Sequence, residues 1–305
     1  MPVPAVGVLA CLASAAAFGA MGIFGKLAYD EDVTVGTLLA LRFAFAALLF
    51  WAVVVGTGRL ESLRRVPRRD VALALGLGAF GYAAQAGAYF AALERLDASL
   101  LSLLLYTFPV MVALAAAALG RERLTRRVAC ALGVSVIGSV LVLGGAPSEA
   151  LDPLGTALGL TAAVVYSAYI LTSAGVSTRL DPLVLATLVA TGATFTLVIA
   201  GVVTSDLRPG DVTTTGYLWL LAIAGVSTVG AITLFFTGLS HVGPTTASIV
   251  STFEPVTAIV LAAATFGESL SPTQLLGGGL VLGAVVVLSA RRRAALVAAE
   301  AAAPA

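Results

Sequence analysis

The amino-acid sequence predicts an all-α protein that crosses a membrane many times. Of its 305 residues, 59% are hydrophobic and only 11% are charged, whereas a soluble protein carries about 25% charged residues. The mean hydropathy is +1.04, and long apolar stretches alternate with short polar breaks along the chain. These observations exclude an ordinary soluble domain and indicate a bundle of transmembrane helices.

Ten apolar stretches are long enough to be transmembrane helices, because about 20 apolar residues span a hydrocarbon core of about 30 Å. The longest break between them, from Arg59 to Asp70, is too short for a soluble domain. The first stretch has no basic residues before it, so we expect a retained span and not a signal peptide. The expected spans are residues 5–27, 34–55, 71–93, 99–119, 128–145, 154–174, 183–204, 216–238, 244–266 and 273–290.

Basic residues predict the orientation of the spans. If the N-terminus is cytoplasmic, the cytoplasmic breaks hold thirteen arginines and the outer breaks hold two. Positively charged loops stay in the cytoplasm, so we expect a multi-pass protein of the cytoplasmic (inner) membrane with both termini inside. The cytoplasmic arginines are Arg59, Arg64, Arg65, Arg68, Arg69, Arg121, Arg123, Arg126, Arg127, Arg179, Arg291, Arg292 and Arg293, and the outer ones are Arg95 and Arg208.

An internal repeat divides the chain into two halves. Leu93, Pro109, Glu122, Leu124 and Gly133 recur 146 positions later as Leu239, Pro255, Glu268, Leu270 and Gly279, and the front parts of the halves align at an offset of 148. Each half holds an odd number of spans, so the second half must insert upside down. We expect two inverted five-helix repeats, at residues 1–146 and 147–291, and a disordered cytoplasmic tail at 292–305. Inverted repeats with proline-interrupted helices are typical of alternating-access transporters.

Glu254 and Pro255 lie near the middle of the ninth stretch. A charge at the bilayer midplane costs about 2.5–3.5 kcal/mol on insertion scales, so this carboxyl should face a polar cavity, pair with another group or carry a proton. Pro255 has no N–H, which frees the carbonyl of Ser251 and bends the helix. We expect Ser251 and Glu254 to line a cavity; the alternative is a kinked packing helix with a hydrogen-bonded carboxyl. Pro109 marks the corresponding kink in the first half.

Two further charged residues are expected inside the membrane. Arg42 lies about seven residues into the second stretch, and Lys26 lies near the outer end of the first. Neither of them, nor Glu254, has a charged counterpart in the other half, so the charges could distinguish the two ends of a substrate or form an internal salt bridge. For Arg42 we favour a structural role, in which it bonds helix ends or reaches outward to the surface. Lys26 can reach outward in the same way.

Polar and aromatic side chains recur at helical spacing in the third, fourth and sixth stretches. They are Tyr82, Gln85 and Tyr89, then Tyr106, then Tyr166 and Tyr169. Residues three and four apart share a helical face, so these side chains are suited to line a site for an amphipathic substrate with an apolar or aromatic body. The alternative is helix packing with hydroxyls bonded across the bundle. We expect Glu122 and Glu268 to satisfy helix ends or loop backbone.

Short motifs in both halves carry a resemblance to a known family. They are Phe18-Gly19-Ala20-Met21-Gly22-Ile23-Phe24-Gly25-Lys26, Leu41-Arg42-Phe43, Leu103-Leu104-Leu105-Tyr106-Thr107-Phe108-Pro109 with Arg121-Glu122-Arg123-Leu124, and Phe253-Glu254-Pro255 with Phe266-Gly267-Glu268. In this order and spacing they resemble the EamA family of the drug/metabolite transporter superfamily, over about residues 6–290. The resemblance implies ten helices, both termini inside, and export or exchange of amino acids, related metabolites or drugs. The chain lacks the Trp that often stands near Phe18 in that family.

Other functions lack the residues that they need. One histidine, His241, and two cysteines, Cys11 and Cys130, offer no metal cluster, disulfide framework or catalytic set, so we expect neither an enzyme nor a cofactor. A net charge of +1 without a basic surface argues against nucleic-acid binding.

We therefore expect a secondary transporter whose partners are a small-molecule substrate and the lipid bilayer, with a monomer compatible with the sequence. The expected activity is export or exchange of amino acids or related metabolites by alternating access. The alternatives are efflux of drugs or lipophilic cations and, in another class, a structural or scaffold membrane protein. Proton antiport and facilitated exchange are both compatible with the sequence.

The charge distribution predicts that the break between residues 59 and 70 faces the cytoplasm. In a variant without Cys11 and Cys130, Ser62→Cys should react with an impermeant maleimide only after the cells are permeabilised. Asp30→Cys, on the expected outer side, is the matched control and should react in intact cells. Labelling of position 62 in intact cells would contradict the orientation.

Overall fold

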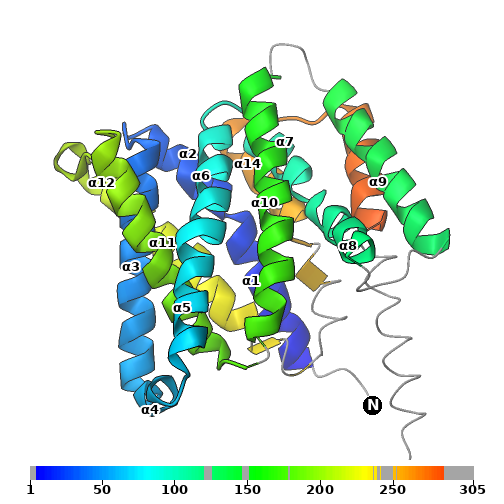
Figure 1. The fold of residues 1–305 in the computed structure, drawn as a ribbon. Helices are drawn as coiled ribbons and strands as arrows, with labels where there is room; N and C mark the ends of the chain where they lie inside the picture. Colours follow the sequence, from blue (N-terminus) through cyan, green and yellow to red (C-terminus); the bar gives the residue numbers. More distant parts are fainter. Residues whose placement is uncertain are drawn as a thin grey trace, which may run out of the picture.

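The computed structural model describes residues 5–119, 126–145, 151–177, 179–235, 237–238, 241, 250–251 and 253–284. Within these residues every regular element is a helix, and Figure 1 shows the helices packed side by side. The expected role of Glu122 and the expected disordered tail at 292–305 lie outside the described residues, as do most of residues 239–252. An all-helical fold is therefore confirmed for the described part of the chain.

The helices follow the apolar stretches closely. In the first half they are α1 (Ala5–Gly19), α2 (Met21–Tyr29), α3 (Val35–Gly56), α4 (Leu60–Arg64), α5 (Arg68–Gly76), the π-helix η1 (Leu77–Tyr82), α6 (Ala83–Leu93), α7 (Ala98–Leu105), α8 (Phe108–Ala118) and α9 (Arg126–Gly144). In the second half they are α10 (Pro153–Ser177), α11 (Pro182–Val203), the short η3 (Pro209–Asp211), α12 (Thr214–Ala224), the π-helix η4 (Gly225–Gly230) and α14 (Phe253–Phe266), and residues 272–284 are also helical.

Six helical segments of the described chain are long and apolar enough to cross a membrane. They are Ala5–Tyr29, Val35–Gly56, Arg68–Leu93, Pro153–Ser173, Pro182–Val203 and Thr214–Phe235. They coincide with the first three expected spans and with the sixth, seventh and eighth. Two shorter apolar helices, Ala98–Val112 and Phe253–Phe266, occupy the fourth and ninth. The multi-pass membrane architecture thus agrees with the sequence analysis.

Capping residues explain where several helices begin. The Thr34 hydroxyl accepts a hydrogen bond from the Thr37 N–H at the start of α3, and the Thr213 hydroxyl accepts one from the Gly216 N–H at the start of α12. Asp181 accepts two such bonds at the start of α11, where proline takes the first helical position. Side-chain oxygens in these positions satisfy backbone donors that have no partner inside the helix.

Helices of the two halves interleave in the bundle. Helix α3 packs against α11, α6 against α10, α2 against α12, and α1 against α14, so each of these contacts joins one half to the other. The closest crossing joins η1 to α11 through two glycines. A Cβ atom on Gly78 would overlap the backbone of Val189, and one on Gly192 would overlap the backbone of Leu75. Small residues therefore let these two helices approach to backbone contact.

The two π-helical segments lie at matching positions in the halves. Segment η1 begins at Leu77 and η4 begins at Gly225, which is the 148-residue offset at which the front parts of the halves align. π-Helical turns are rare and occur often at functional sites. The same irregularity in both halves directs attention to the helices that contain it.

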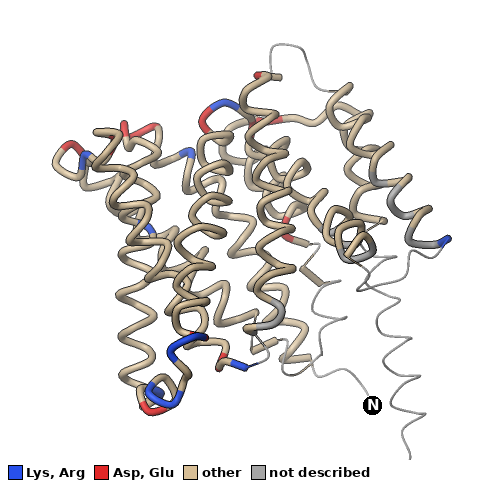
Figure 2. The backbone as a smooth tube through the Cα atoms, in the orientation of Figure 1, with Lys and Arg blue, Asp and Glu red and all other residues tan. Residues whose placement is uncertain are grey.

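Charged residues gather mainly at the two ends of the bundle, as Figure 2 shows. At the end that carries α4, Arg59 pairs with Asp181 at 2.9 Å and Arg179 pairs with Asp70 at 3.0 Å. Both pairs join the first half to the second. The middle of the bundle is almost entirely apolar, so the few charged side chains there stand out.

The crossing of η1 and α11 predicts a steric requirement for Gly78. Gly78→Ala should lower the apparent melting temperature of the purified protein, because overpacking of this kind costs about 1–3 kcal/mol. Gly76→Ala is the matched control, since no atom lies within 4 Å of a Cβ atom built there. If both variants melt at the same temperature, the crossing does not depend on a bare backbone at residue 78.

Candidate functional site

Pro255 lies in the first turn of α14, and the residues around it have a specific partner in the other half of the chain. The Ser251 carbonyl, which lies four residues before Pro255, is 2.7 Å from the Tyr106 hydroxyl, and the same hydroxyl is 3.1 Å from Oε2 of Glu254. Tyr106 itself lies at the break between α7 and α8, just before Pro109. The expectation that Pro255 frees the Ser251 carbonyl is consistent with this bond, and the two helix breaks meet each other.

The Tyr106 hydroxyl has one proton and two acceptors within reach. When Glu254 carries a proton, its O–H can donate to Tyr106 while Tyr106 donates to the Ser251 carbonyl, and all three groups are satisfied. When Glu254 is ionised, the carboxylate and the carbonyl compete for the single Tyr106 proton. A buried acceptor without its partner costs about 1–3 kcal/mol, so the hydrogen bonds at this site change with the proton on Glu254.

A continuous row of aromatic rings begins at Tyr106. Each ring lies within contact range of the next, and all six rings come from the polar stretches and motifs that the sequence singled out. The ring centroids are separated by 5.7 Å for Tyr106–Phe108, 4.6 Å for Phe108–Tyr166, 6.3 Å for Tyr166–Tyr169, 5.6 Å for Tyr169–Tyr82 and 5.3 Å for Tyr82–Phe43. These six residues are called the aromatic row below. Separations of this size are those of interacting rings.

Arg42 lies at the other end of the aromatic row. Its side chain is only 2% exposed, and its guanidinium carbon lies 4.8 Å from the centre of the Phe43 ring and 5.2 Å from that of Phe90. Its Nε donates to the Thr228 hydroxyl in η4 at 3.2 Å. The expectation that Arg42 bonds helix ends or reaches outward is therefore wrong, because ring faces and a hydroxyl from the other half hold it inside the bundle.

The π-helical turn of η4 makes Thr228 available to Arg42. The Thr228 hydroxyl donates its proton to the carbonyl of Ile223, five residues earlier, at 3.0 Å. Its lone pairs are therefore free to accept the bond from Arg42. Thr228, Phe90, Phe43 and Phe108 were not predicted as site residues; the only signal in the sequence is that Phe43 and Phe108 adjoin Arg42 and Pro109.

Gln85 and Tyr89 lie on α6 between the two charged ends. Gln85 is 9% exposed and Tyr89 is 5% exposed, so both face the interior. The Tyr89 hydroxyl is within electrostatic reach of both Glu254 and Arg42, and its ring packs edge-on against Phe90 at 5.2 Å. Among the predicted site residues, contacts join Tyr82, Tyr106, Tyr166, Tyr169, Ser251 and Glu254, and Lys26 lies apart from them.

Glycines of the first motif bring α1 and α2 against this region. A Cβ atom on Gly19 would lie 2.6 Å from the carbonyl oxygen of Glu254, and one on Gly22 would lie 3.1 Å from the Tyr89 hydroxyl. Only a bare backbone fits so close to α14. The glycines in the Phe18 to Lys26 motif therefore help to position the acidic end of the site.

Lys26 lies outside the aromatic row, and carboxylates neutralise its charge there. Its ammonium lies 3.0 Å from Oε1 of Glu268 and 3.6 Å from Oδ1 of Asp97. Of the two alternatives left open for Lys26, the structure agrees with an internal salt bridge between the halves, because two carboxylates hold its ammonium between α2, α7 and the end of α14. Neither Lys26 nor Arg42 forms an ion pair with Glu254 in the described part of the chain.

Glu268 caps α7 from another helix. Its carboxylate accepts hydrogen bonds from the backbone N–H groups of Ala98 at 3.2 Å and Ser99 at 3.0 Å. The expectation that Glu268 satisfies a helix end is confirmed. Burial raises the pKa of the Glu268 carboxyl, but the bond from Ser99 and the Lys26 ammonium together lower it by more, so its pKa lies below its usual value. Glu268 therefore stays ionised and serves structure.

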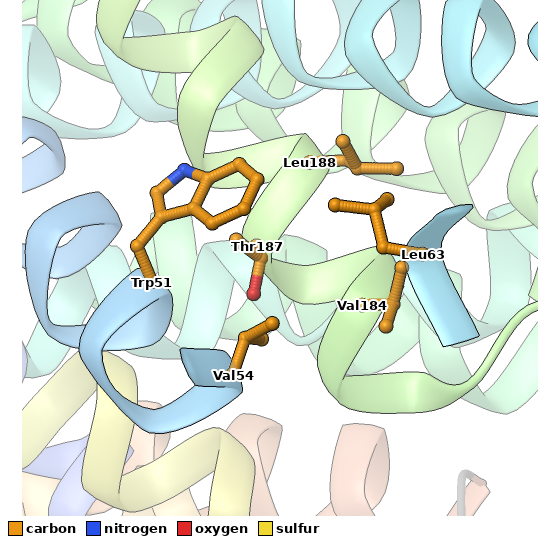
Figure 3. A pocket seen from close by; sticks show the side chains of 6 residues that line it. All are labelled: Trp51, Val54, Leu63, Val184, Thr187 and Leu188. Atoms are coloured by element: carbon orange, nitrogen blue, oxygen red, sulfur yellow. The ribbon is translucent and has the colours of Figure 1, made fainter. Parts of the chain in front are cut away.

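Two other features do not provide a site. The hollow in Figure 3 has no room for even a water molecule, and no charged side chain lines it. It is lined by Trp51, Val54, Leu63, Val184, Thr187 and Leu188. Among the described residues, no three His, Cys, Asp or Glu side chains are grouped as metal ligands would be.

Comparisons with known proteins concern the family and the fold of the chain. The model of the EamA-like transporter family matches residues 5–144 and 153–290. A protein of Archaeoglobus fulgidus described as an uncharacterized transporter is 29% identical over 285 residues, which cover 92% of this chain and 95% of that protein. A solved crystal structure superposes with a TM-score of 0.66 and 19% identity, covering 94% of this chain and 98% of the other. At that identity the structural likeness concerns the fold alone.

The bridge from Tyr106 to α14 predicts a stability cost for losing one hydroxyl. Tyr106→Phe keeps the ring in the aromatic row but leaves the Ser251 carbonyl and Glu254 without their shared partner, so we expect a loss of about 1–3 kcal/mol. The measurement is the apparent melting temperature in detergent. Tyr166→Phe, which also keeps its ring, is the matched control and should melt close to the wild type. Equal melting of both variants would show that the bridge does not stabilise the bundle.

Proposed function

The chain belongs to the EamA-like transporter family, a branch of the drug/metabolite transporter superfamily, and from this premise we propose that it exports or exchanges amino acids or related small metabolites. Both the family and the similar archaeal protein point to a membrane transporter and not to an enzyme. The observation that carries the proposal is the row of buried and half-buried aromatic side chains between Glu254 and Arg42. A site with an apolar body and a charge of opposite sign at each end suits a small amphipathic metabolite.

We propose that transport proceeds by alternating access between two inverted five-helix repeats, in a ten-helix bundle of the cytoplasmic membrane with both termini inside. Matching π-helical segments in the two halves support this proposal, as do helix breaks before Pro109 and at Pro255. In a protein of this kind the substrate site lies between the repeats, at discontinuous helices. The Tyr106 bond joins those breaks, so rocking of the halves would open this contact first.

The aromatic row would then act as the wall of the substrate site. Its rings contact one another in the present conformation, so a substrate enters as α7 and α8 move away from α10 and α14. The apolar part of the substrate replaces ring–ring contacts with ring–substrate contacts. Tyr82, Gln85 and Tyr89 provide hydroxyl and amide groups that orient it.

Glu254 is proposed to carry a coupling proton. The Tyr106 hydroxyl contacts both the Ser251 carbonyl and Oε2 of Glu254, so when Glu254 loses its proton the carboxylate competes for the Tyr106 proton and weakens the bond from Tyr106 to Ser251. Proton release and opening of the site are thereby linked. An ionised Glu254 would also attract a cationic group of the substrate once the site opens. The proton and the substrate would then bind Glu254 in turn, so that one is exchanged for the other.

The second candidate function is efflux of lipophilic cations. A row of tyrosine and phenylalanine rings with one carboxyl is suited to bind such cations. The buried positive charge of Arg42 at the other end of the row disfavours them. Counterflow in proteoliposomes with amino acids, purines and lipophilic cations separates these functions, and a purified protein that exchanges none of them would support a structural role instead.

If Glu254 carries the coupling proton, Glu254→Gln should uncouple transport from the pH gradient without abolishing transport. The glutamine amide can donate to Tyr106 as a protonated carboxyl does, so the variant should fold and catalyse counterflow, while accumulation driven by a pH gradient should fall at least about tenfold. Glu61→Gln, at an exposed position in α4, is the control and should behave as wild type. A raised KM with intact gradient-driven accumulation would assign Glu254 to the substrate cation instead. Wild-type kinetics from about pH 5 to 8 would contradict both roles.

A further inference from the structure

We infer that Arg42 binds a carboxylate group of the substrate; this inference rests on the proposed transport function. Six ion pairs occur in the described part of the chain, and none of them includes Arg42. Asp70, which is also buried at 8% exposure, has Arg179 at 3.0 Å. A buried charge without an opposite charge is costly, and such a residue inside a membrane usually serves a ligand or an ion.

The surroundings of Arg42 neutralise its charge only in part. Two ring faces lie within 4.8 Å and 5.2 Å of the guanidinium carbon, and Thr228 accepts from Nε. The titratable groups that act on the guanidinium are hydroxyls, those of Tyr82, Tyr89 and Tyr29. Rings and hydroxyls attract a cation weakly compared with a carboxylate. The site therefore holds a positive charge for which the described protein supplies no counter-ion.

The geometry around Arg42 suits a carboxylate. Thr228 accepts a hydrogen bond from Nε, and the Tyr82 hydroxyl also bonds to the guanidinium. The other N–H groups belong to a planar fork of the kind that binds carboxylates at two points. A phosphate carries about −1.5 to −2 charges at neutral pH, so a single guanidinium among apolar rings would leave it under-neutralised. A carboxylate carries one charge and is matched by one guanidinium.

The residues beside Arg42 indicate which groups the rest of the substrate carries. Phe43 begins the aromatic row, so a carboxylate held at Arg42 places its apolar body along the rings of Tyr82 and Tyr169. Glu254 contacts Tyr106 at the other end of the aromatic row, and both Glu254 and Arg42 act on the Tyr89 hydroxyl, so a second, acidic pole belongs to the same site. The substrate class is thus a carboxylic acid with an apolar or aromatic body, and an amino group on it would face the acidic pole.

Three matched probes test the carboxylate role: phenylalanine, 3-phenylpropionate, which has no amine, and phenethylamine, which has no carboxylate. The wild-type protein should exchange or be thermally stabilised by phenylalanine and phenylpropionate. Arg42→Gln should weaken the response to both at least about tenfold and leave the response to phenethylamine unchanged. Arg42→Lys keeps the charge without the fork and should recover only part of the carboxylate response.

A purely structural Arg42 predicts a different pattern, in which all three probes lose the same factor in Arg42→Gln; that result would overturn the inference. If Arg42→Gln does not fold, Thr228→Val removes the oxygen that orients the guanidinium and should weaken phenylpropionate several-fold while sparing phenethylamine. An equal effect on both probes would again overturn it.

Failure of the transport proposal is distinguishable from failure of the carboxylate site. If the wild type exchanges no probe but phenylpropionate raises its melting temperature, and Arg42→Gln abolishes that rise, the site stands although transport of these compounds does not. If the wild type exchanges phenethylamine as well as it exchanges phenylalanine, transport stands and the carboxylate site is wrong. A wild type that neither exchanges nor is stabilised by any carboxylate probe contradicts the site.

Discussion

The carbonyl of Ser251 must find a hydrogen-bond donor in a region from which water is excluded, and much of the site follows from the way it does so. Pro255 removes the donor that an uninterrupted helix would supply, and backbone at membrane depth survives only if the protein satisfies it. Tyr106 meets this requirement from the opposite half. Because the same hydroxyl contacts Glu254, one residue fixes the helix break, positions the acid and begins the aromatic row.

The charges of the bundle fall into two groups with different environments. Lys26, Arg59 and Arg179 are neutralised by carboxylates near the helix ends, where they hold helices of the two halves together. Arg42 and Glu254 instead contact rings and hydroxyls. A charge satisfied by neutral groups can exchange them for a ligand without breaking an ion pair, whereas Lys26 would have to give up two carboxylates. The distinction separates residues that hold the bundle together from residues suited to bind cargo.

Local sequence patterns predicted the helices and much of the site, and contacts between the halves account for the rest. Apolar length located the spans, the missing N–H of Pro255 indicated the Ser251 carbonyl that Tyr106 contacts, and helical spacing grouped Tyr82 with Gln85. The partner of Arg42 was not predictable in this way, because Thr228 lies 186 residues away and becomes available through a π-helical turn. The specific pairing of Lys26 with Glu268 was not predictable for the same reason. The sequence shows which residues are charged, but only the fold shows which of these residues form ion pairs.

The π-helical turns have a consequence for how this architecture can change. A π turn accommodates one more residue than an α turn, so a one-residue deletion inside η1 can be absorbed when the π turn becomes an α turn, and Gln85 and Tyr89 then keep their neighbours. The same deletion within α6 would rotate everything beyond it by about 100°. The span would still insert, yet the side chains beyond the deletion would face different neighbours. The π segments are therefore places where the residue count of a span can change while the rest of its lining is kept.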